Sequence, residues 1–205
     1  MNPSMAAVAA MTLSAVAVAQ TVNFDSDPVG APPGDWTCGV TGKGSPRWGV
    51  AAEPGGAGKV LMQLGSGTFP WCVKNGTALA DGSVEVKFQS ISGREDQAGG
   101  VVWRWKDRDN YYVARANALE NNVSLYYTER GSRKTLKYVD APVATGVWHS
   151  LKVDFAGTRI AVSLDGKRYI EMDDSHITGP GAVGVWTKAD SVTAFKDFTY
   201  VAASR

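Results

Sequence analysis

The sequence predicts an all-β domain, built as an antiparallel sandwich or barrel, and two observations support this. Segments in which apolar and polar residues alternate recur along the chain, and Gly, Asp, Asn and Pro separate them. After the first twenty residues, no segment shows the i, i+3, i+4 spacing of an amphipathic helix. Strands that follow one another without intervening helices are typical of sandwiches and barrels.

The clearest strand covers residues 149–155, where alternation places Leu151, Val153 and Phe155 on one face. The dipeptide Asp165-Gly166 predicts a type I′ hairpin turn between strands at 160–164 and 167–172. Further strands are expected at 83–89, 123–127, 182–187 and 193–201, with loops at 25–34 and 53–58.

The N-terminal segment predicts export. Residues 5–19 are mostly apolar, no charged side chain precedes Asp25, and Ala17-Val18-Ala19 fits a small-x-small cleavage site. We therefore expect a signal peptide at 1–19 and one secreted or periplasmic domain at 20–205. The alternatives are a buried helix or a membrane anchor, although the stretch is short and rich in alanine for a span. No other segment is apolar enough to insert into a membrane.

The two cysteines and the charge balance restrict the class of protein further. In an exported chain, Cys38 and Cys72 predict one disulfide, and the alternative is a pair of free buried thiols. The formal net charge of +1 gives no reason to expect nucleic acid as a partner, because proteins that bind nucleic acid carry a surplus of basic residues.

Several short motifs occur in a characteristic order: Asn23-Phe24-Asp25, then 99–105 (GGVVWRW), 110–115 (NYYVAR), 148–153 (WHSLKV), 181–187 (GAVGVWT) and 195–198 (FKDF). In this order they resemble concanavalin A-like domains of bacterial secreted proteins, and most closely the 3-keto-disaccharide hydrolase family. They are also similar to laminin-G-like domains and, more distantly, to family-16 glycoside hydrolases. The resemblance covers nearly the whole chain after the signal peptide. It implies a two-sheet antiparallel β-sandwich, a jelly roll with one concave sheet, and a glycan as the commonest ligand.

The stretch from 103 to 127 is the richest in side chains suited to sugar recognition. Aromatic faces stack on the apolar side of a sugar ring, and arginine forks and amides reach paired hydroxyl groups. Alternation places Trp103 and Trp105 on one face and Arg104 on the other. The predicted ligand-binding residues are Arg104, Trp105, Asn110, Arg115, Asn117 and Tyr126. The alternative is that the tryptophans belong to the core and the arginines pair with surface acids.

A catalytic pair is harder to find. Family-16 enzymes carry Glu-x-Asp-x-Glu on one strand, which brings two acids together on one face. The nearest match supplies Glu171 and Asp173, but Ser175 and His176 occupy the place of the second glutamate. The alternative is an exposed acidic turn. The chain contains no His-Glu-x-x-His zinc motif and no Gly-x-Ser-x-Gly elbow.

The resemblance also implies one structural calcium, for which Asp25 and Asp197 are the candidate ligands. The alternative is that both acids pair with lysines. We expect no other cofactor. The first functional hypothesis is a glycan-binding module that uses its concave sheet. The alternatives are a glycoside hydrolase acting on a disaccharide or keto-disaccharide, and a non-catalytic structural or protein-interaction domain.

Overall fold

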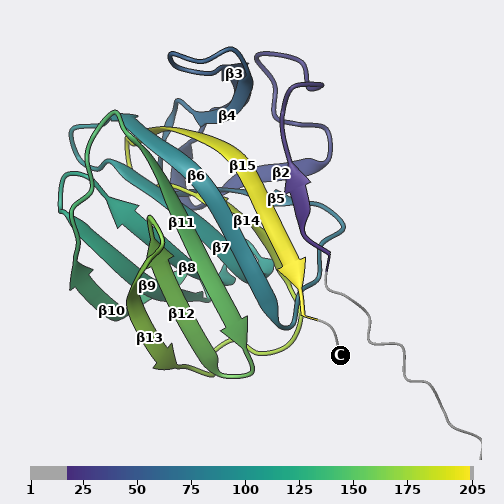
Figure 1. Cartoon of the computed structure of the whole chain (residues 1–205), viewed down its shortest axis with the longest axis vertical. Helices are drawn as coiled ribbons and strands as arrows, with labels where there is room; N and C mark the ends of the chain where they lie inside the picture. Colours follow the sequence, from purple (N-terminus) through teal and green to yellow (C-terminus); the bar gives the residue numbers. More distant parts are fainter. Residues whose placement is uncertain (1–17, 204–205) are drawn as a thin grey trace, which may run out of the picture.

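The computed structural model describes residues 18–203, and within this range the chain forms two antiparallel sheets and no helix (Figure 1). Sheet A has the strand order β13-β12-β11-β6-β15-β4-β3, and β1 also pairs with β15. Sheet B has the order β10-β9-β8-β7-β14-β5-β2. The predicted two-sheet antiparallel sandwich is confirmed. Nearly all of the predicted signal peptide, 1–19, lies outside the described residues.

The strands are distributed between the two sheets as follows. Sheet A contains β1 (Gln20–Val22), β3 (Trp48–Ala52), β4 (Lys59–Gln63), β6 (Gly82–Ser92), β11 (Trp148–Ala156), β12 (Arg159–Leu164), β13 (Lys167–Asp173) and β15 (Val192–Ala202). Sheet B contains β2 (Trp36–Ser45), β5 (Ser66–Lys74), β7 (Ala98–Asp107), β8 (Asn110–Asn117), β9 (Asn122–Glu129), β10 (Ser132–Asp140) and β14 (Ala182–Trp186). Between residues 18 and 203, no helix long and apolar enough to cross a membrane is found.

Alternating side chains build the core between the sheets. Leu151, Val153 and Phe155 of β11 are buried, as their period-two spacing predicts, while the residues between them are half-buried. They pack against sheet B, where Trp103 and Val185 are fully buried. Full burial of an aliphatic or aromatic side chain of this size stabilises the fold by about 1.5–3 kcal/mol. The alternation therefore determines which face of each strand is turned inward.

The hairpin between β12 and β13 turns at Asp165-Gly166. Their φ angles are 51° and 77°, and two successive positive φ values confirm the predicted type I′ turn. Asp165 also holds the start of β11, because its carboxylate accepts a hydrogen bond from the backbone N–H of Ser150 at 2.8 Å. The second carboxylate oxygen lies 2.7 Å from Nδ1 of the buried His149.

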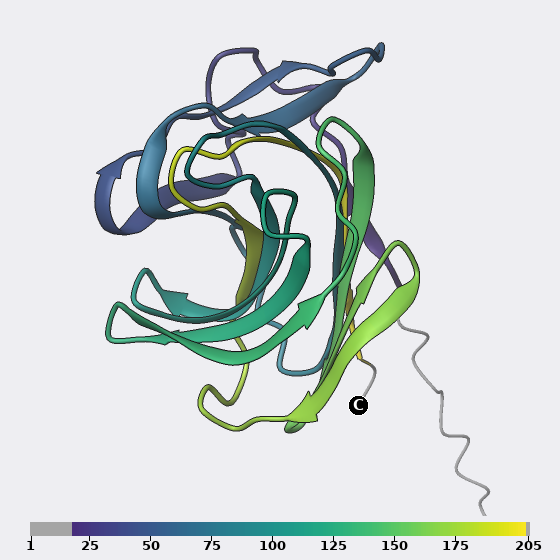
Figure 2. The same ribbon diagram turned by 90° about the vertical axis from the view of Figure 1, so that its left-hand side faces the viewer.

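Sheet B is strongly curved. Figure 2 shows it rolled into a C, with β2 and β5 in one arm and β8 to β10 in the other, while sheet A lies against its convex side. The two arms are in contact where the hydroxyl groups of Tyr111 in β8 and Thr41 in β2 are 2.8 Å apart. The concave side of sheet B, which is called the groove below, therefore lies between two arms, and residues of both arms line an open cleft there.

A disulfide joins Cys38 of β2 to Cys72 of β5, which confirms the predicted pairing. The two residues lie directly opposite each other in the antiparallel register, with their Cα atoms 4.0 Å apart. The bridge closes a loop between positions separated by 34 residues and ties together one arm of the groove.

Removing this bridge should lower the free energy of unfolding. In the chain-entropy model, a loop of this length contributes about 4 kcal/mol. We expect the Cys38→Ala/Cys72→Ala variant to lose roughly this amount in guanidinium unfolding. Dithiothreitol should destabilise the wild type and leave the variant unchanged. A wild type that is insensitive to the reductant would contradict the disulfide.

Candidate functional site on the concave sheet

A layer of aromatic side chains covers the concave face of sheet B. It forms a second apolar cluster, separate from the core between the sheets. The rings of Phe69 and Trp186 stack with their centroids 5.7 Å apart, and those of Trp71 and Trp105 are 5.2 Å apart. The buried members are Trp71, Val73, Ala98, Val102, Tyr111, Val113, Tyr126 and Trp186, against which Phe69, Trp105 and Ala182 pack half-buried. The floor of the groove is therefore filled by the chain's own rings.

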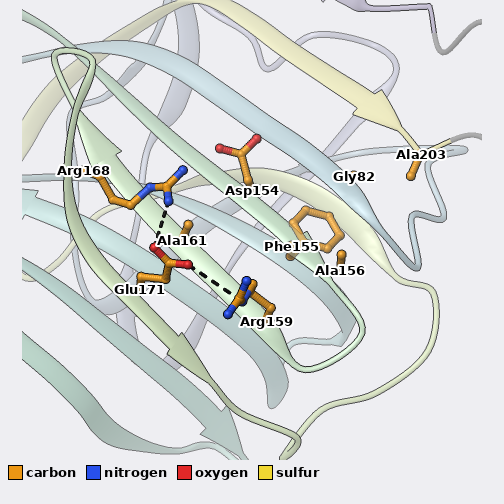
Figure 3. A pocket seen from close by; sticks show the side chains of 9 residues that line it. All are labelled: Gly82, Asp154, Phe155, Ala156, Arg159, Ala161, Arg168, Glu171 and Ala203. Atoms are coloured by element: carbon orange, nitrogen blue, oxygen red, sulfur yellow. Dashed lines mark hydrogen bonds and ion pairs between the residues drawn. The ribbon is translucent and has the colours of Figure 1, made fainter.

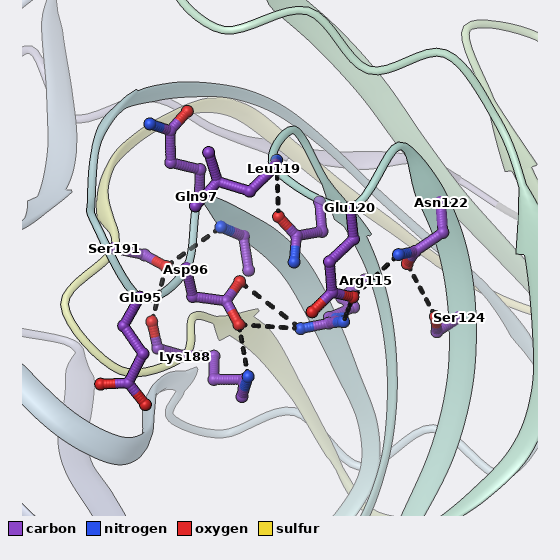
Figure 4. Close-up of polar contacts among 12 residues, drawn as sticks. Glu95, Asp96, Gln97, Arg115, Leu119, Glu120, Asn122, Ser124, Lys188 and Ser191 are labelled. Carbon is purple, nitrogen blue, oxygen red and sulfur yellow. Dashed lines mark hydrogen bonds and ion pairs between the residues drawn. The ribbon is translucent and has the colours of Figure 1, made fainter.

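A charged network lies beside this layer (Figure 4). The carboxylate of Asp96 is fully buried and accepts a hydrogen bond from Nη1 of Arg115 at 3.2 Å. Nζ of Lys188 is bound to the same carboxylate at 2.5 Å. Nη2 of Arg115 donates to Glu120, whose carboxylate also accepts a hydrogen bond from Nδ2 of Asn122 at 2.8 Å. Arg115 is thus held between two acids and is only 2% exposed.

The loop that carries Asp96 is fixed by a second acid. The Asp190 carboxylate accepts hydrogen bonds from the backbone N–H groups of Arg94, Glu95 and Asp96 at 2.8, 3.0 and 3.0 Å. Burial alone would raise the pKa of Asp190, but these hydrogen bonds outweigh it and lower the pKa. The carboxylate of Asp96 is therefore held rigidly in front of Arg115.

An open cleft of about 420 Å³ lies between the two arms of the groove. Phe69 stands on one side of it and Arg133 of β10 on the other. The guanidinium carbon of Arg133 lies 4.2 Å from the ring centroid of Tyr126 and 4.5 Å from that of Phe69. The lining residues are Lys43, Gly44, Ser66, Gly67, Thr68, Phe69, Glu95, Arg133, Lys188 and Ala189.

Arg133 has an unusual environment for a charged side chain. Its Nη1 atom is buried, and no atom of residues 18–203 accepts a hydrogen bond from it. Burial lowers the pKa of the guanidinium, and the nearby Arg115 acts in the same direction. Asp96, the buried acid of this region, is bound to Arg115 and Lys188 instead.

Comparison with solved structures finds the same architecture in several proteins. The carbohydrate-binding module CBM66 from Bacillus subtilis superposes with a TM-score of 0.67 at 22% identity, covering 80% of this chain and 94% of that chain. The Bacillus licheniformis beta-glucanase superposes with a TM-score of 0.60 at 11% identity, covering 93% of this chain and 99% of that chain. A putative glycosyl hydrolase from Parabacteroides distasonis superposes with a TM-score of 0.57 at 14% identity, covering 90% of this chain and 100% of that chain.

The fold is the concanavalin A-like jelly roll. At these identities the similarity shows the shared fold alone. No protein-family model matches the sequence, and no curated protein does. The narrower resemblance to the 3-keto-disaccharide hydrolase family therefore stays a prediction.

Arg104 does not face the groove of this jelly roll, so its predicted place in the site is wrong. Its φ is +47°, and a bulge at this point in β7 breaks the alternation, because Ala182 pairs with Trp105 and Gly184 with Val102. The guanidinium of Arg104 instead donates to backbone carbonyls of Ala80, Gly157 and Ile177. The same bulge turns Trp105 into the groove, away from the face that it was predicted to share with Trp103.

The other predicted site residues lie in two different places. Arg115, Asn117 and Tyr126 lie on the concave face as expected, but they are 2%, 0% and 3% exposed, so they form its floor. Asn110 is the first residue of β8, directly after the β7–β8 turn, and its Nδ2 donates to Asp107 at 2.9 Å. The predicted residues therefore do not form one solvent-open site.

The sequence analysis missed the residues of the open cleft. Arg133 lies in an edge strand without clean alternation, and Phe69 lies in β5, for which no strand was predicted. The two residues meet only because sheet B curls. The sequence signal for this site was a short basic segment at 132–138, which contains Arg133, Lys134 and Lys137.

The candidate acids Glu171 and Asp173 lie on β13, on the outer face of sheet A. Figure 3 shows Glu171 in a shallow hollow of about 370 Å³, where it pairs with Arg168 at 2.8 Å and Arg159 at 3.8 Å. Asp173 accepts a hydrogen bond from Oγ1 of Thr158 at 2.8 Å. Their position matches the alternative interpretation, an exposed acidic segment, and not the concave groove.

Asp25 and Asp197, the predicted calcium ligands, each have a lysine nearby. Asp25 accepts a hydrogen bond from the backbone N–H of Lys59 at 3.0 Å, and Asp197 pairs with Nζ of Lys87 at 2.9 Å. In the described part of the chain, no three His, Cys, Asp or Glu side chains gather in a metal-binding arrangement. As placed, these acids do not fit a calcium cage, and calcium binding stays a prediction.

The buried ion pair gives a stability test. Replacing Arg115 with Met should lower the free energy of unfolding by about 3 kcal/mol, because Asp96 would remain buried with an incomplete set of partners. Urea unfolding measures this loss. The control is Lys152→Met, which breaks an exposed pair with Asp154 and should cost less than about 1 kcal/mol. Equal losses in the two variants would contradict the assigned role of Arg115.

The pKa of Glu120 predicts a pH dependence. Burial alone would raise it, but hydrogen bonding from Asn122 and the charge of Arg115 lower it below its ordinary value of 4.5. The unfolded chain thus takes up this proton more readily, and stability should fall as the pH drops from about 5 through the lowered pKa. Between pH 7 and pH 3, the free energy of unfolding should decline less steeply for Glu120→Gln than for the control variant Glu129→Gln. Identical slopes would refute the assignment.

Proposed function

We propose that this chain is a carbohydrate-binding module and that its binding site is the cleft between β5 and β10. One observation carries the proposal: the cleft combines an aromatic ring, Phe69, with a planar fork of hydrogen-bond donors, Arg133. Sugar rings offer an apolar C–H face and paired hydroxyl groups, which these two groups match. The cleft volume of about 420 Å³ falls within the usual range for small-ligand sites.

The electrostatics of the groove favour binding over hydrolysis. Retaining hydrolysis needs two carboxyl groups about 5 Å apart, one as nucleophile and one as acid. Asp96 and Glu120 are both occupied by Arg115, and the lowered pKa of Glu120 is the reverse of what a general acid requires. Glu95 is the single acid among the residues that line the cleft.

Two further observations support the proposal. Structures with this fold include a carbohydrate-binding module and a beta-glucanase, which supports a glycan as the class of ligand. The Cys38–Cys72 disulfide supports a secreted or periplasmic location, because disulfides persist in oxidising compartments.

A glycan array followed by calorimetry tests the proposal. We expect the domain 20–205 to bind at least one glycan without releasing reducing ends. Phe69→Ala should weaken binding roughly tenfold, because the apolar contact between this ring and the sugar would be lost. Trp105→Ala is the matched control, since this half-buried ring lies on the same concave face and does not line the cleft.

Three results would contradict the proposal. Loss of binding in Trp105→Ala but not in Phe69→Ala would place the site elsewhere in the groove. Release of reducing ends would favour the hydrolase. Binding to no glycan would favour a structural or protein-interaction domain.

A further inference from the structure

The cleft carries more positive than negative charge. Lys43, Arg133 and Lys188 line it, against the single acid Glu95. Lys188 is bound to the buried Asp96, so its charge is largely matched within the protein. Arg133 differs, because no carboxylate of residues 18–203 forms an ion pair with it.

An unmatched guanidinium at a partly buried site is costly. Its Nη1 atom has lost water and gained no acceptor, so its desolvation is not repaid within the protein. Contacts with the rings of Tyr126 and Phe69 favour the cation but supply no acceptor. An anion in the cleft would supply the opposite charge, and its oxygens would accept hydrogen bonds from the other N–H groups of the guanidinium.

The hollow on sheet A makes the contrast clear. Arg159 and Arg168 also line a depression there, but both pair with Glu171, and their side chains are 68% and 56% exposed. Asp154 also lines this hollow, so two acids face two solvated cations there, and the hollow gives no reason to expect an anion. Of the two hollows, the concave cleft is the one in which an arginine, Arg133, has no ion-pair partner among residues 18–203.

We propose that the ligand of the cleft is an acidic glycan, whose carboxylate or sulfate group binds the fork of Arg133. This inference rests on the proposed carbohydrate-binding function. The planar guanidinium can donate two parallel hydrogen bonds to either anion, and Lys43 adds favourable charge beside it. We expect a neighbouring sugar ring to contact the part of Phe69 that lines the cleft, beside the faces that pack on Trp186 and Arg133.

Matched pairs of probes test this inference. Calorimetry with an oligogalacturonate and its methyl ester isolates the carboxylate, and dextran sulfate with dextran isolates the sulfate. We expect the charged member of at least one pair to bind roughly 10- to 100-fold more tightly, because this is the gain in affinity that a hydrogen bond to a charged group typically provides. Arg133→Gln should remove this preference.

Two other variants keep the test interpretable. Lys134→Gln removes the same charge from the neighbouring position, which points to the other face of β10, and it should retain the preference. Arg133→Lys keeps the charge but loses the fork of donors. Its preference for the charged probe should lie between that of the wild type and that of Arg133→Gln. Circular dichroism and thermal unfolding check that each variant is folded.

The outcomes separate the inference from the function on which it rests. Equal binding of charged and neutral partners would overturn the acidic-glycan inference and leave the carbohydrate-binding proposal standing. Equal losses in Arg133→Gln and Lys134→Gln would also overturn it, because the attraction would then be non-specific. Binding of none of the probes, nor of any array glycan, would overturn both.

Discussion

The curl of sheet B determines what the concave side can do, and close packing of rings against backbone makes the curl possible. Glycines provide the space. A Cβ atom at Gly39 would lie 2.8 Å from the ring of Trp71, and one at Gly184 would lie 2.2 Å from the carbonyl oxygen of Cys72. With side chains absent at these points, Trp71 lies directly over β2, and β14 approaches β5 closely. In the curled sheet, the guanidinium of Arg133 in β10 lies over the ring of Phe69 in β5.

The floor and the opening of the groove have opposite physical character. On the floor, Arg115 has its partners, Asp96 and Glu120, and the surrounding rings exclude water. Such a network is rigid because every loss of a partner leaves a buried charge. At the opening, Arg133 has aromatic neighbours and no acid. A rigid floor that holds a cation in place lowers the conformational cost of binding.

Period-two alternation predicted five strands of sheet A, β6, β11, β12, β13 and β15, and the buried face of β11, with Leu151, Val153 and Phe155, but it missed β1, β3 and β4. It failed at Arg104, where a non-glycine residue adopts a positive φ and shifts the register of the rest of β7. A single sequence contains no signal for such a bulge. The partners of Arg115 show a second limit. Glu120 is five residues away, but Asp96 comes from another loop, and Lys188 lies 92 residues beyond it.

The most direct test of the central claim is to locate the ligand on the folded domain. Nuclear magnetic resonance shifts of backbone amides and of arginine Nε–H groups, recorded during titration with an oligogalacturonate or a sulfated dextran oligomer, would do so. The curl of sheet B predicts that the largest changes fall on Arg133 and on residues of β5 and β10 that line the cleft. Changes centred on Arg159 and Arg168 of sheet A, with Arg133 unaffected, would contradict it.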